Sequence, residues 1–486
     1  MRTQFSYFHE MSSEPNGSLQ ACNHYPRAIM GAYLQTRFQE AVQSAEQAGL
    51  AVNLYPESEV VELKQNGHQI QLGIKHLLSG HYFSKEADRA LLATGHWSED
   101  SDQDHYFTSP WPAKKLRQSI PPGTKIAVIG TSLSAIETLL TLTSDGTFVR
   151  GEDGELTYSP SENSRKFVLY SRRGLLPKVR GKMGSYRNRF LNRKNLSRLM
   201  AENRRDLTLD KIFELLNLEL ETAYGRTIDW EEIINPTGKP ADLLQGYLDD
   251  ALGGDGRDGE LIWQTILHQG VDMVRDVYLS LTLEDRRRFD KNYTSVFFTH
   301  AATQPSINAE KLLALLKAGI VEVRKLGENY RLVKNAVEDC YEFTYRDGRG
   351  NLKTEAHTYV VNARGQEKSL STNPSELAKN LLKSGTILIE ELRPPGYTAD
   401  SNIETTTKLK TAGGAYKTGS IWIDPGTHHI MQRGPNNKVA QSSTIYAVGA
   451  MTRGQIIDAS MARGIVQATS RIADDLVNYL TRINKE

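Results

Sequence analysis

The chain has 486 residues, of which 39% are hydrophobic and 24% are charged, and this length and balance allow two or three folded domains and exclude the disordered, collagen-like and coiled-coil classes. Its 59 Lys and Arg residues offset 58 Asp and Glu residues, so the net charge of +1 disfavours a general nucleic-acid binder or a protein drawn to anionic membranes. With two cysteines, no Cys/His cluster and no long apolar run, the sequence predicts a cytoplasmic protein without a metal centre, a disulfide scaffold or a membrane span.

The first quarter of the chain predicts one helix and several short strands. From Ile29, apolar residues recur at helical spacing as far as Gly49, which favours a helix with a buried face. A further apolar strand, residues 87–94, ends at Gly95. Between them, strand-like segments separated by turn residues predict a small antiparallel meander, at residues 51–55, 59–63 and 69–74.

The middle and the end of the chain alternate strand and helix signals. A strand, a turn and a helix are predicted at residues 125–137, and a second strand at residues 166–170. Residues 194–299 have a mostly helical pattern, and Asn308 is expected to cap a helix that leads into another strand. The last elements expected are a strand, residues 445–448, and a long helix directly after it.

A turn of small residues follows the strand at residues 125–129 and has the form Gly-x-Ser-x-x-Ala. Gly130 permits a tight turn, Ser132 stands where backbone must approach a pyrophosphate, and Ala135 keeps the helix near the sheet. The amides that open the helix carry positive partial charge. The turn therefore predicts a dinucleotide diphosphate site, at Gly130, Thr131, Ser132, Ser134 and Ala135.

Two arginines follow the second strand of this unit. The end of that strand faces the adenosine ribose in dinucleotide-binding folds, where arginine accommodates a 2′-phosphate. Ser171, Arg172 and Arg173 therefore point to NADPH, provided that residues 143–165 form an inserted surface loop. The alternative is an ordinary sheet-forming unit whose arginines are merely solvated.

Three further strand ends stop at small residues where the chain can change direction. They are Ala93-Thr94-Gly95-His96, the segment 359–365, and the segment 446–455 with its glycines Gly449 and Gly454. Together with Tyr25-Pro26-Arg27 and the Gly130 turn, they resemble the FAD/NAD(P)-binding family of bacterial flavoproteins. That family is distantly similar to flavin-dependent N-hydroxylating monooxygenases, including those that act on amino acids.

The resemblance implies an α/β fold with two Rossmann-like dinucleotide-binding domains, a helical insertion and FAD beside NADPH. It also implies that helix-start amides after Gly449 point at the flavin. The flavin-facing positions that it implies are Thr94, Gly95, His96, Gly449, Met451, Gly454 and Gln455. No Gly-x-Gly-x-x-Gly turn precedes Tyr25, so the first FAD β-α-β unit is expected to be missing. The expected divisions are an FAD part (residues 1–115), an NADP part (116–193), the helical insertion (194–304), the rest of the NADP part (305–366) and a return to the FAD part (367–486).

The function predicted on this basis is an NADPH-dependent flavoprotein oxidoreductase, monooxygenase-like, that oxidises a small molecule such as an amine or amino acid. The alternative is a catalytically silent remnant that binds a nucleotide or a partner. Hydrolase motifs are lacking, and no catalytic residue can be selected. Neighbouring residues on a strand face opposite sides, so His428 and His429 could not bind one metal and are interpreted as surface or core residues. The basic segment 178–193 is expected to bind a phosphate or an acidic substrate, or to be solvated.

Overall fold

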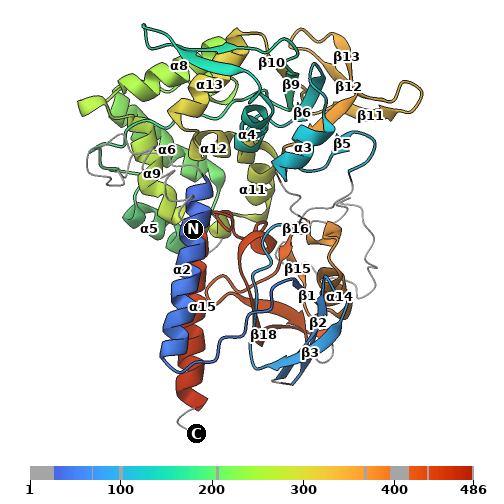
Figure 1. Cartoon of the computed structure of the whole chain (residues 1–486). Helices are drawn as coiled ribbons and strands as arrows, with labels where there is room; N and C mark the ends of the chain where they lie inside the picture. Colours follow the sequence, from blue (N-terminus) through green and yellow to red (C-terminus); the bar gives the residue numbers. More distant parts are fainter. Residues whose placement is uncertain are drawn as a thin grey trace. The chain divides into compact units, whose positions relative to one another are not determined.

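The computed structural model describes residues 27–67, 69–97, 102–203, 207–365, 369–393, 415–434 and 437–483. The chain divides into two compact units, Met1–Ser58 and Glu59–Glu486. In the first unit, helix α2 (Arg27–Gln47) forms where helical spacing predicts it (Figure 1). Its larger apolar side chains are 47–56% exposed, so the expected buried face is not observed, at Met30, Tyr33, Leu34 and Phe38. The strand expected at residues 51–55 does not form.

The second unit contains a five-stranded parallel sheet with the order β10-β9-β6-β14-β5. The central strand pairs Val128 with Leu169 on one side and with Val361 on the other. The fold class is therefore mixed α/β, as expected. The strands are β5 (Tyr106–Phe107), β6 (Lys125–Ile129), β9 (Lys166–Ser171), β10 (Val321–Lys325) and β14 (Tyr359–Asn362).

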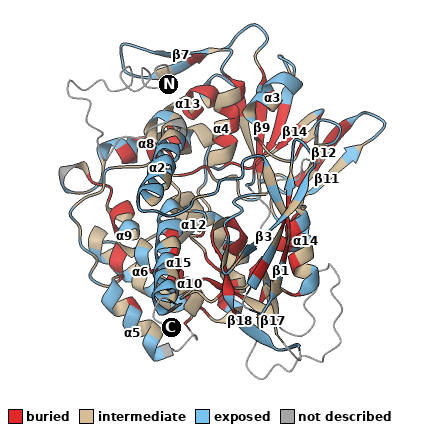
Figure 2. Ribbon diagram, turned by 60° about the horizontal axis from the view of Figure 1, so that its bottom comes forward, coloured by how far each residue is buried: buried red, intermediate tan, exposed pale blue. Residues whose placement is uncertain are grey.

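The sheet is buried on both faces, which explains why its strands are almost continuously apolar. Ile126 and Val128 pack against helices, whereas Ala127 and Ile129 pack against an antiparallel meander on the other face. Figure 2 shows red, buried stretches in β9 and β14. The covering helices are α3 (Ala113–Ser119), α4 (Leu133–Leu142) and α13 (Ser306–Lys317), and the meander is β11 (Arg331–Asn335), β12 (Cys340–Arg346) and β13 (Leu352–His357).

Two local predictions in this region are wrong. Residues 143–165 do not form a plain surface loop, because they contain the hairpin β7 (Thr147–Arg150) and β8 (Leu156–Ser159). Tyr158 of the hairpin is buried and its hydroxyl donates to the Thr143 carbonyl oxygen at 3.0 Å. Helix α13 starts at Ser306 after Pro305, so Asn308 is inside the helix and does not cap it. Pro305 occupies the cap position with the extended backbone that suits it.

The segment expected to be helical is helical. Its apolar stripes meet in two clusters, one around Ile266 and Met273 and one around Leu207 and Tyr278. The helices are α5 (Arg193–Asn203), α6 (Leu209–Tyr224), α7 (Trp230–Ile234), α8 (Pro240–Gly253), α9 (Ile262–Gly270), α10 (Val274–Ser280), α11 (Leu283–Arg288) and α12 (Thr294–Ala301).

The remaining elements come from both ends of the sequence of this unit. Two of the three strands expected in the meander form, as β1 (Ser58–Asn66) and β2 (Gln69–His76), and the third strand of this sheet is β3 (Tyr82–Ala87) in place of residues 51–55. Strand β4 (Ala90–Leu92) pairs in parallel with β18 (Val439–Ala447), whose other neighbour is β17 (His429–Arg433). Their core also includes the pair β15 (Ile389–Leu392) and β16 (Tyr416–Ile421) and helix α14 (Glu376–Ser384).

The end of the chain differs from the prediction in one respect. A long helix directly after Gly449 was expected, but residues Gly449–Thr452 form a single 3-10 turn. The long helix, α15 (Ala462–Ile483), begins ten positions after Thr452. Of its expected stripe, Ala468 and Ile472 are buried, and Leu480 is exposed.

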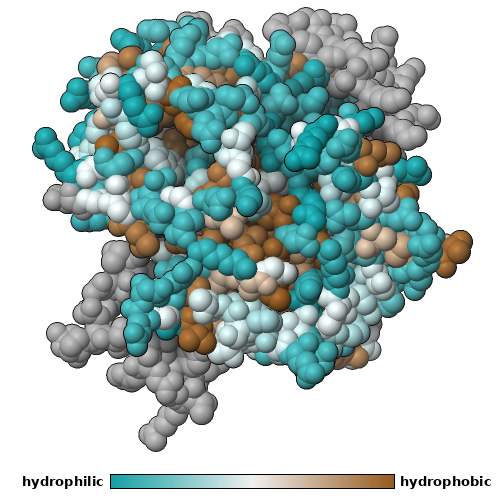
Figure 3. All heavy atoms as spheres, turned by 90° about the horizontal axis from the view of Figure 1, so that it is seen from above, coloured by the Kyte–Doolittle hydropathy of each residue, from teal (hydrophilic) through white to brown (hydrophobic). Residues whose placement is uncertain are grey.

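The face drawn in Figure 3 is mostly hydrophilic, with hydrophobic residues gathered toward its centre. In the part of the chain that the structure describes, no helix combines the length and the apolar character needed to cross a membrane.

Candidate functional site: a dinucleotide crevice and two glycine joints

The parallel sheet has a switch point at its central strand. From β6 the chain passes through α4 to β9 on one side, and it later enters β14 on the other side of β6. The connections therefore diverge at the carboxyl ends of β6 and β14. In open α/β sheets, ligands bind in the crevice outside such a switch point.

Gly130 stands at this point, and its backbone requires glycine. Its φ is +126°, and a Cβ built on it would lie 2.8 Å from the Ala363 carbonyl oxygen. The Ala363 amide donates to the Ile129 carbonyl oxygen at 2.8 Å, so this backbone has little room to retreat. Glycine at this position permits the close approach of the two strand ends and the tight turn that a phosphate-binding loop needs.

Helix α4 opens onto this turn. Ser132 is its exposed N-cap and makes no side-chain capping bond, and the first intrahelical bond runs from the Ile136 amide to the Ser132 carbonyl oxygen. The amides of Ser134 and its neighbours lie in the first turn, where an α-helix has no internal acceptor for them. Ala135 is fully buried against the sheet, as its small size allows. Such a helix start can bind an anion.

Thr131 and Ser171 are brought together, but their side chains are used within the protein. The buried Thr131 hydroxyl donates to the Leu175 carbonyl oxygen at 2.6 Å and to Ser171 Oγ at 3.1 Å. Ser171 Oγ also accepts from the Gly174 amide at 2.9 Å. These bonds join the turn after β6 to the turn after β9, so both side chains help to shape the crevice.

The two predicted arginines have different surroundings. Arg172 is exposed after β9 and pairs with Glu328 at 3.4 Å, an exposed ion pair of little energetic value. Arg173 donates to the Asn292 carbonyl oxygen at 2.9 Å and to Asn235 Oδ1 at 3.3 Å, both in the helical insertion.

Sequence reasoning did not select Arg364, an exposed cation at the end of β14 that the structure places beside the crevice. Its amide nitrogen lies 3.3 Å from the Cβ position built on Gly130, and its Nε donates to Asn362 Oδ1 at 3.0 Å. Its position within the joint at residues 359–365 was the available signal.

The first and last joints meet in space. The Val448 amide donates to the Leu92 carbonyl oxygen at 3.0 Å, and the Thr94 hydroxyl lies 2.9 Å from Met451 Sδ. Gly95 and Gly449 have φ of +68° and +81°, and a Cβ at either would have no atom within 4 Å. The joints therefore border open space.

A histidine and an arginine lie near these joints. Burial lowers the pKa of His96, and the charge of Arg453 lowers it further. The Arg453 guanidinium is half-buried, and burial lowers its pKa. Among the described residues it has neither a hydrogen-bond acceptor nor a carboxylate partner, so it can serve an anionic or polar ligand. The prediction did not select Arg453.

Gly454 and Gln455 are engaged in packing. A Cβ at Gly454 would lie 2.5 Å from the Thr418 carbonyl oxygen, so this glycine permits close backbone contact. The buried Gln455 amide accepts from the Ile423 amide at 2.9 Å and donates to the Ile423 carbonyl oxygen at 2.8 Å. Tyr25 and Pro26 of the resemblance lie outside the described residues.

The adjacent histidines are buried. His428 Nδ1 lies 3.3 Å from the Ala447 carbonyl oxygen, and burial lowers the pKa of His428 to about 4. The His429 ring packs against the Tyr446 ring, with the ring centres 4.1 Å apart and the planes tilted by 33°. Elsewhere, three side chains on and beside β12 bring potential ligand atoms within 4.8 Å of one another, at Glu338, Cys340 and Glu342.

Comparison with known proteins gives one family match and one curated relative. Residues 3–97 match a family model described as FAD-NAD(P)-binding. Uncharacterized protein YdhS of Escherichia coli strain K12 is 25% identical over 368 residues, which cover 70% of this chain and 65% of YdhS. The chain thus spans just under two thirds of that relative.

Several solved structures are similar at low identity. Ornithine hydroxylase PvdA of Pseudomonas aeruginosa is 13% identical, with a TM-score of 0.44, over 94% of this chain and 78% of that chain. L-lysine 6-monooxygenase of Pseudomonas syringae is 13% identical, with a TM-score of 0.40, over 87% and 71%. At these scores the likeness carries no argument about activity. The family match confirms the resemblance to FAD/NAD(P)-binding proteins and supports the expected cofactors, FAD and NADPH.

Proposed function

We propose that the protein is an NADPH-dependent flavoprotein oxidoreductase of monooxygenase-like type, which oxidises a small molecule such as an amine or amino acid through FAD. The observation that carries the proposal is the crevice at Gly130, where a tight glycine turn at the sheet's switch point meets the start of α4. The family match over residues 3–97 supports the choice of cofactors.

The crevice residues fit a dinucleotide with a phosphorylated ribose. The first-turn amides of α4 would bind the diphosphate, because they supply donors and positive partial charge. Arg172 would exchange its exposed partner Glu328 for the 2′-phosphate, since a charge-assisted bond to a dianion is stronger than a solvated ion pair. Arg364 would add positive charge at the end of β14.

The joints fit FAD for a separate reason. Gly95 and Gly449 border open space, and Arg453 lies nearby as a half-buried cation without a carboxylate partner among the described residues. When bound, FAD supplies hydride acceptance and reaction with oxygen. The protein's own contribution is to keep the space beside both glycines open and to offer the charge of Arg453 to an anionic or polar part of the cofactor.

The experiment is reconstitution of the full chain with FAD, followed by gel filtration, NADPH titration and measurement of oxygen uptake. We expect a yellow protein, loss of the flavin absorbance when NADPH is added without oxygen, and NADPH-dependent oxygen consumption. A folded, colourless protein that still binds NADPH would favour the silent nucleotide-binding alternative. Absence of both flavin and NADPH binding would refute the proposal.

A further inference from the structure

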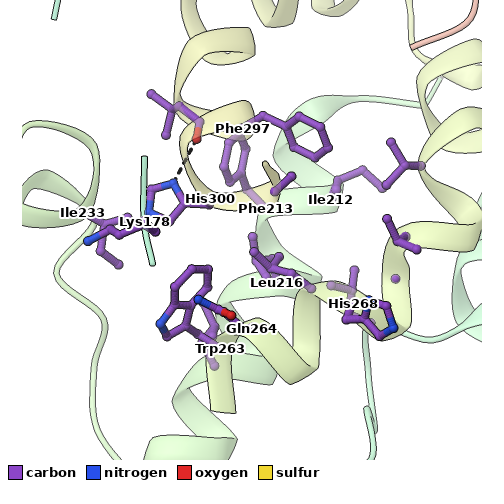
Figure 4. Close-up of a pocket in the computed structure, with 18 of the residues that line it drawn as sticks. Lys178, Ile212, Phe213, Leu216, Ile233, Trp263, Gln264, His268, Phe297 and His300 are labelled. Atoms are coloured by element: carbon purple, nitrogen blue, oxygen red, sulfur yellow. Dashed lines mark hydrogen bonds between the residues drawn. The ribbon is translucent and has the colours of Figure 1, made fainter. Parts of the chain in front are cut away.

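The helical insertion lines most of a partly open cavity of about 990 Å³. Small-molecule pockets have volumes of roughly 300–1,000 Å³, so this one is at the upper end of that range. Much of its wall is apolar and aromatic, from Phe213 and Leu216 on α6, Trp263 on α9 and Phe297 on α12 (Figure 4). A tightly packed protein interior contains few voids of this size, so a cavity with such a lining is suited to an apolar ligand.

Two cations from one extended segment line the same cavity. Val179 between them is buried in the core of the parallel-sheet domain and forms a parallel bridge with Gln304. The amides of Lys178 and Arg180 donate to the carbonyl oxygens of Thr299 and Gln304 at 3.0 and 2.8 Å. Residues two apart on an extended chain face the same side, so Lys178 and Arg180 both face away from the core that holds Val179.

Neither cation forms an ion pair with another of the described residues. Lys178 Nζ lies 3.5 Å from the centre of the Tyr247 ring, and among the described residues neither Lys178 nor Arg180 forms a salt bridge or a side-chain hydrogen bond. Burial lowers the pKa of Lys178 to about 8, although the charges of Asp250 and Glu232 oppose this shift. Burial without a partner disfavours a charged group, and an anionic ligand would relieve that cost.

The acidic side chains of the cavity wall do not supply that partner. Asp229 caps α7 by accepting from the Glu232 amide, and Asp255 accepts from the Tyr224 hydroxyl at 2.6 Å and from the Ile262 amide at 2.7 Å. Glu232 and Asp250 are exposed to solvent.

His300 adds no positive charge at neutral pH. Its Nδ1 lies 2.9 Å from the Val296 carbonyl oxygen, and burial lowers its pKa to about 4. Figure 4 shows Lys178 on the same side of the cavity as His300.

We propose that this cavity binds an amphipathic carboxylate, a fatty or aryl-alkyl acid whose head group pairs with Lys178 and Arg180 and whose apolar body lies among Phe213, Trp263 and Phe297. The planar fork of Arg matches the two oxygens of a carboxylate, and the Lys ammonium adds a compact charge. A cationic head group is disfavoured at the same position by repulsion from both residues.

The test uses three ligands that share a ten-carbon alkyl chain and differ in the head group, namely decanoate, decanol and decylamine. Each is titrated into the full-length protein by calorimetry at neutral pH. Decanoate is expected to bind about ten- to a hundredfold more tightly than decanol, because a hydrogen bond to a charged group contributes that much. Decylamine is expected to bind more weakly than decanol. Equal affinity for the three ligands, or no binding of decanoate, would overturn the proposal.

Variants separate the head-group contacts from the apolar cavity. Lys178→Met and Arg180→Met should each weaken decanoate about tenfold or more and leave decanol unchanged. Lys194→Met, an exposed lysine on α5, is the matched control and should leave both affinities unchanged. Leu216→Trp should weaken all three ligands by filling space. If a variant fails to fold, the head-group series on the unmodified chain still decides the question.

Decyl phosphate distinguishes the kind of anion. Tighter binding of decyl phosphate than of decanoate would show that the cavity reads phosphate and would refute the carboxylate assignment. None of these titrations contains FAD or NADPH, so their failure is distinguishable from failure of the proposed oxidoreductase function.

Discussion

Gly130→Ala is the sharpest perturbation of the dinucleotide crevice. The new Cβ would lie 2.8 Å from the oxygen and 3.0 Å from the carbon of the Ala363 carbonyl, and the φ of +126° disfavours any side chain. The backbone strain is worth about 1–3 kcal/mol, and the overpacking about 1–3 kcal/mol more. Since Ala363 is hydrogen-bonded to Ile129, we expect the strand ends to separate and the crevice to deform.

Gly123→Ala is the matched control, because this glycine precedes the same strand with φ of +75° and would bring its Cβ within 4 Å of no atom. It should lose about 1–2 kcal/mol from backbone strain and keep its NADPH affinity. The assay combines urea unfolding with calorimetric NADPH titration. The reasoning is refuted if Gly130→Ala binds NADPH as well as Gly123→Ala does and unfolds with the same loss of free energy.

Ser132→Asp covers the case in which Gly130→Ala does not fold. A carboxylate at the N-cap of α4 should preserve stability or raise it by up to about 1 kcal/mol, because it interacts favourably with the helix dipole. At about 4 Å from a bound phosphate the same charge would repel it by about 1–4 kcal/mol, so NADPH affinity should fall at least about fivefold. A stable Ser132→Asp protein with unchanged NADPH affinity would show that the helix start does not hold the diphosphate.

Arg172→Ala should weaken NADPH binding about tenfold and leave NADH binding unchanged. Arg173→Ala should leave the ratio of NADPH to NADH affinity unchanged, because the Arg173 side chain bonds to the helical insertion. Titration of both nucleotides checks this, and a ratio altered by Arg173→Ala alone would reverse the assignment. Arg286→Met should destabilise the protein by about 3–5 kcal/mol in urea unfolding, because it leaves the carboxylate of Glu390, 3.1 Å away and equally buried, without its counter-charge; a loss below about 1 kcal/mol would contradict this. The free energy of unfolding should fall as pH drops from 6.5 toward about 4, because His428 in the unfolded chain binds a proton that the folded, buried ring does not. Denaturant unfolding between pH 7 and 4 measures this dependence, and His428→Gln should flatten it.

The local pattern of the sequence determined the dinucleotide unit. An apolar strand, a turn of small residues and an amphipathic helix follow one another at residues 125–137, and each is specified by neighbours in the chain. The structure therefore reproduces β6, the Gly130 turn and α4, and it pairs β9 beside β6 as a parallel crossover requires. The helical insertion and two strands of the small meander, β1 and β2, were predictable for the same reason.

Predictions that depended on how a segment packs were less successful. Residues 143–165 have the composition of a loop, yet they pair as a hairpin because Tyr158 finds a buried site beside α4. The glycine after β18 suggested a helix start, but Arg275 binds Asp458 and the Gly464 carbonyl oxygen and so holds the start of α15 further along the chain. No local pattern contains these contacts.

Only the tertiary structure decided what the predicted positions do. Residues distant in sequence meet at Gly130 and Ala363 and again at Thr94 and Met451, and such pairings depend on sheet order, which a linear pattern does not encode. The same is true of the insertion cavity, where the extended backbone around Val179 directs two cations toward an apolar space that other helices enclose. The sequence thus determined the elements and the cofactor class, and packing determined which side chains remain available to a ligand.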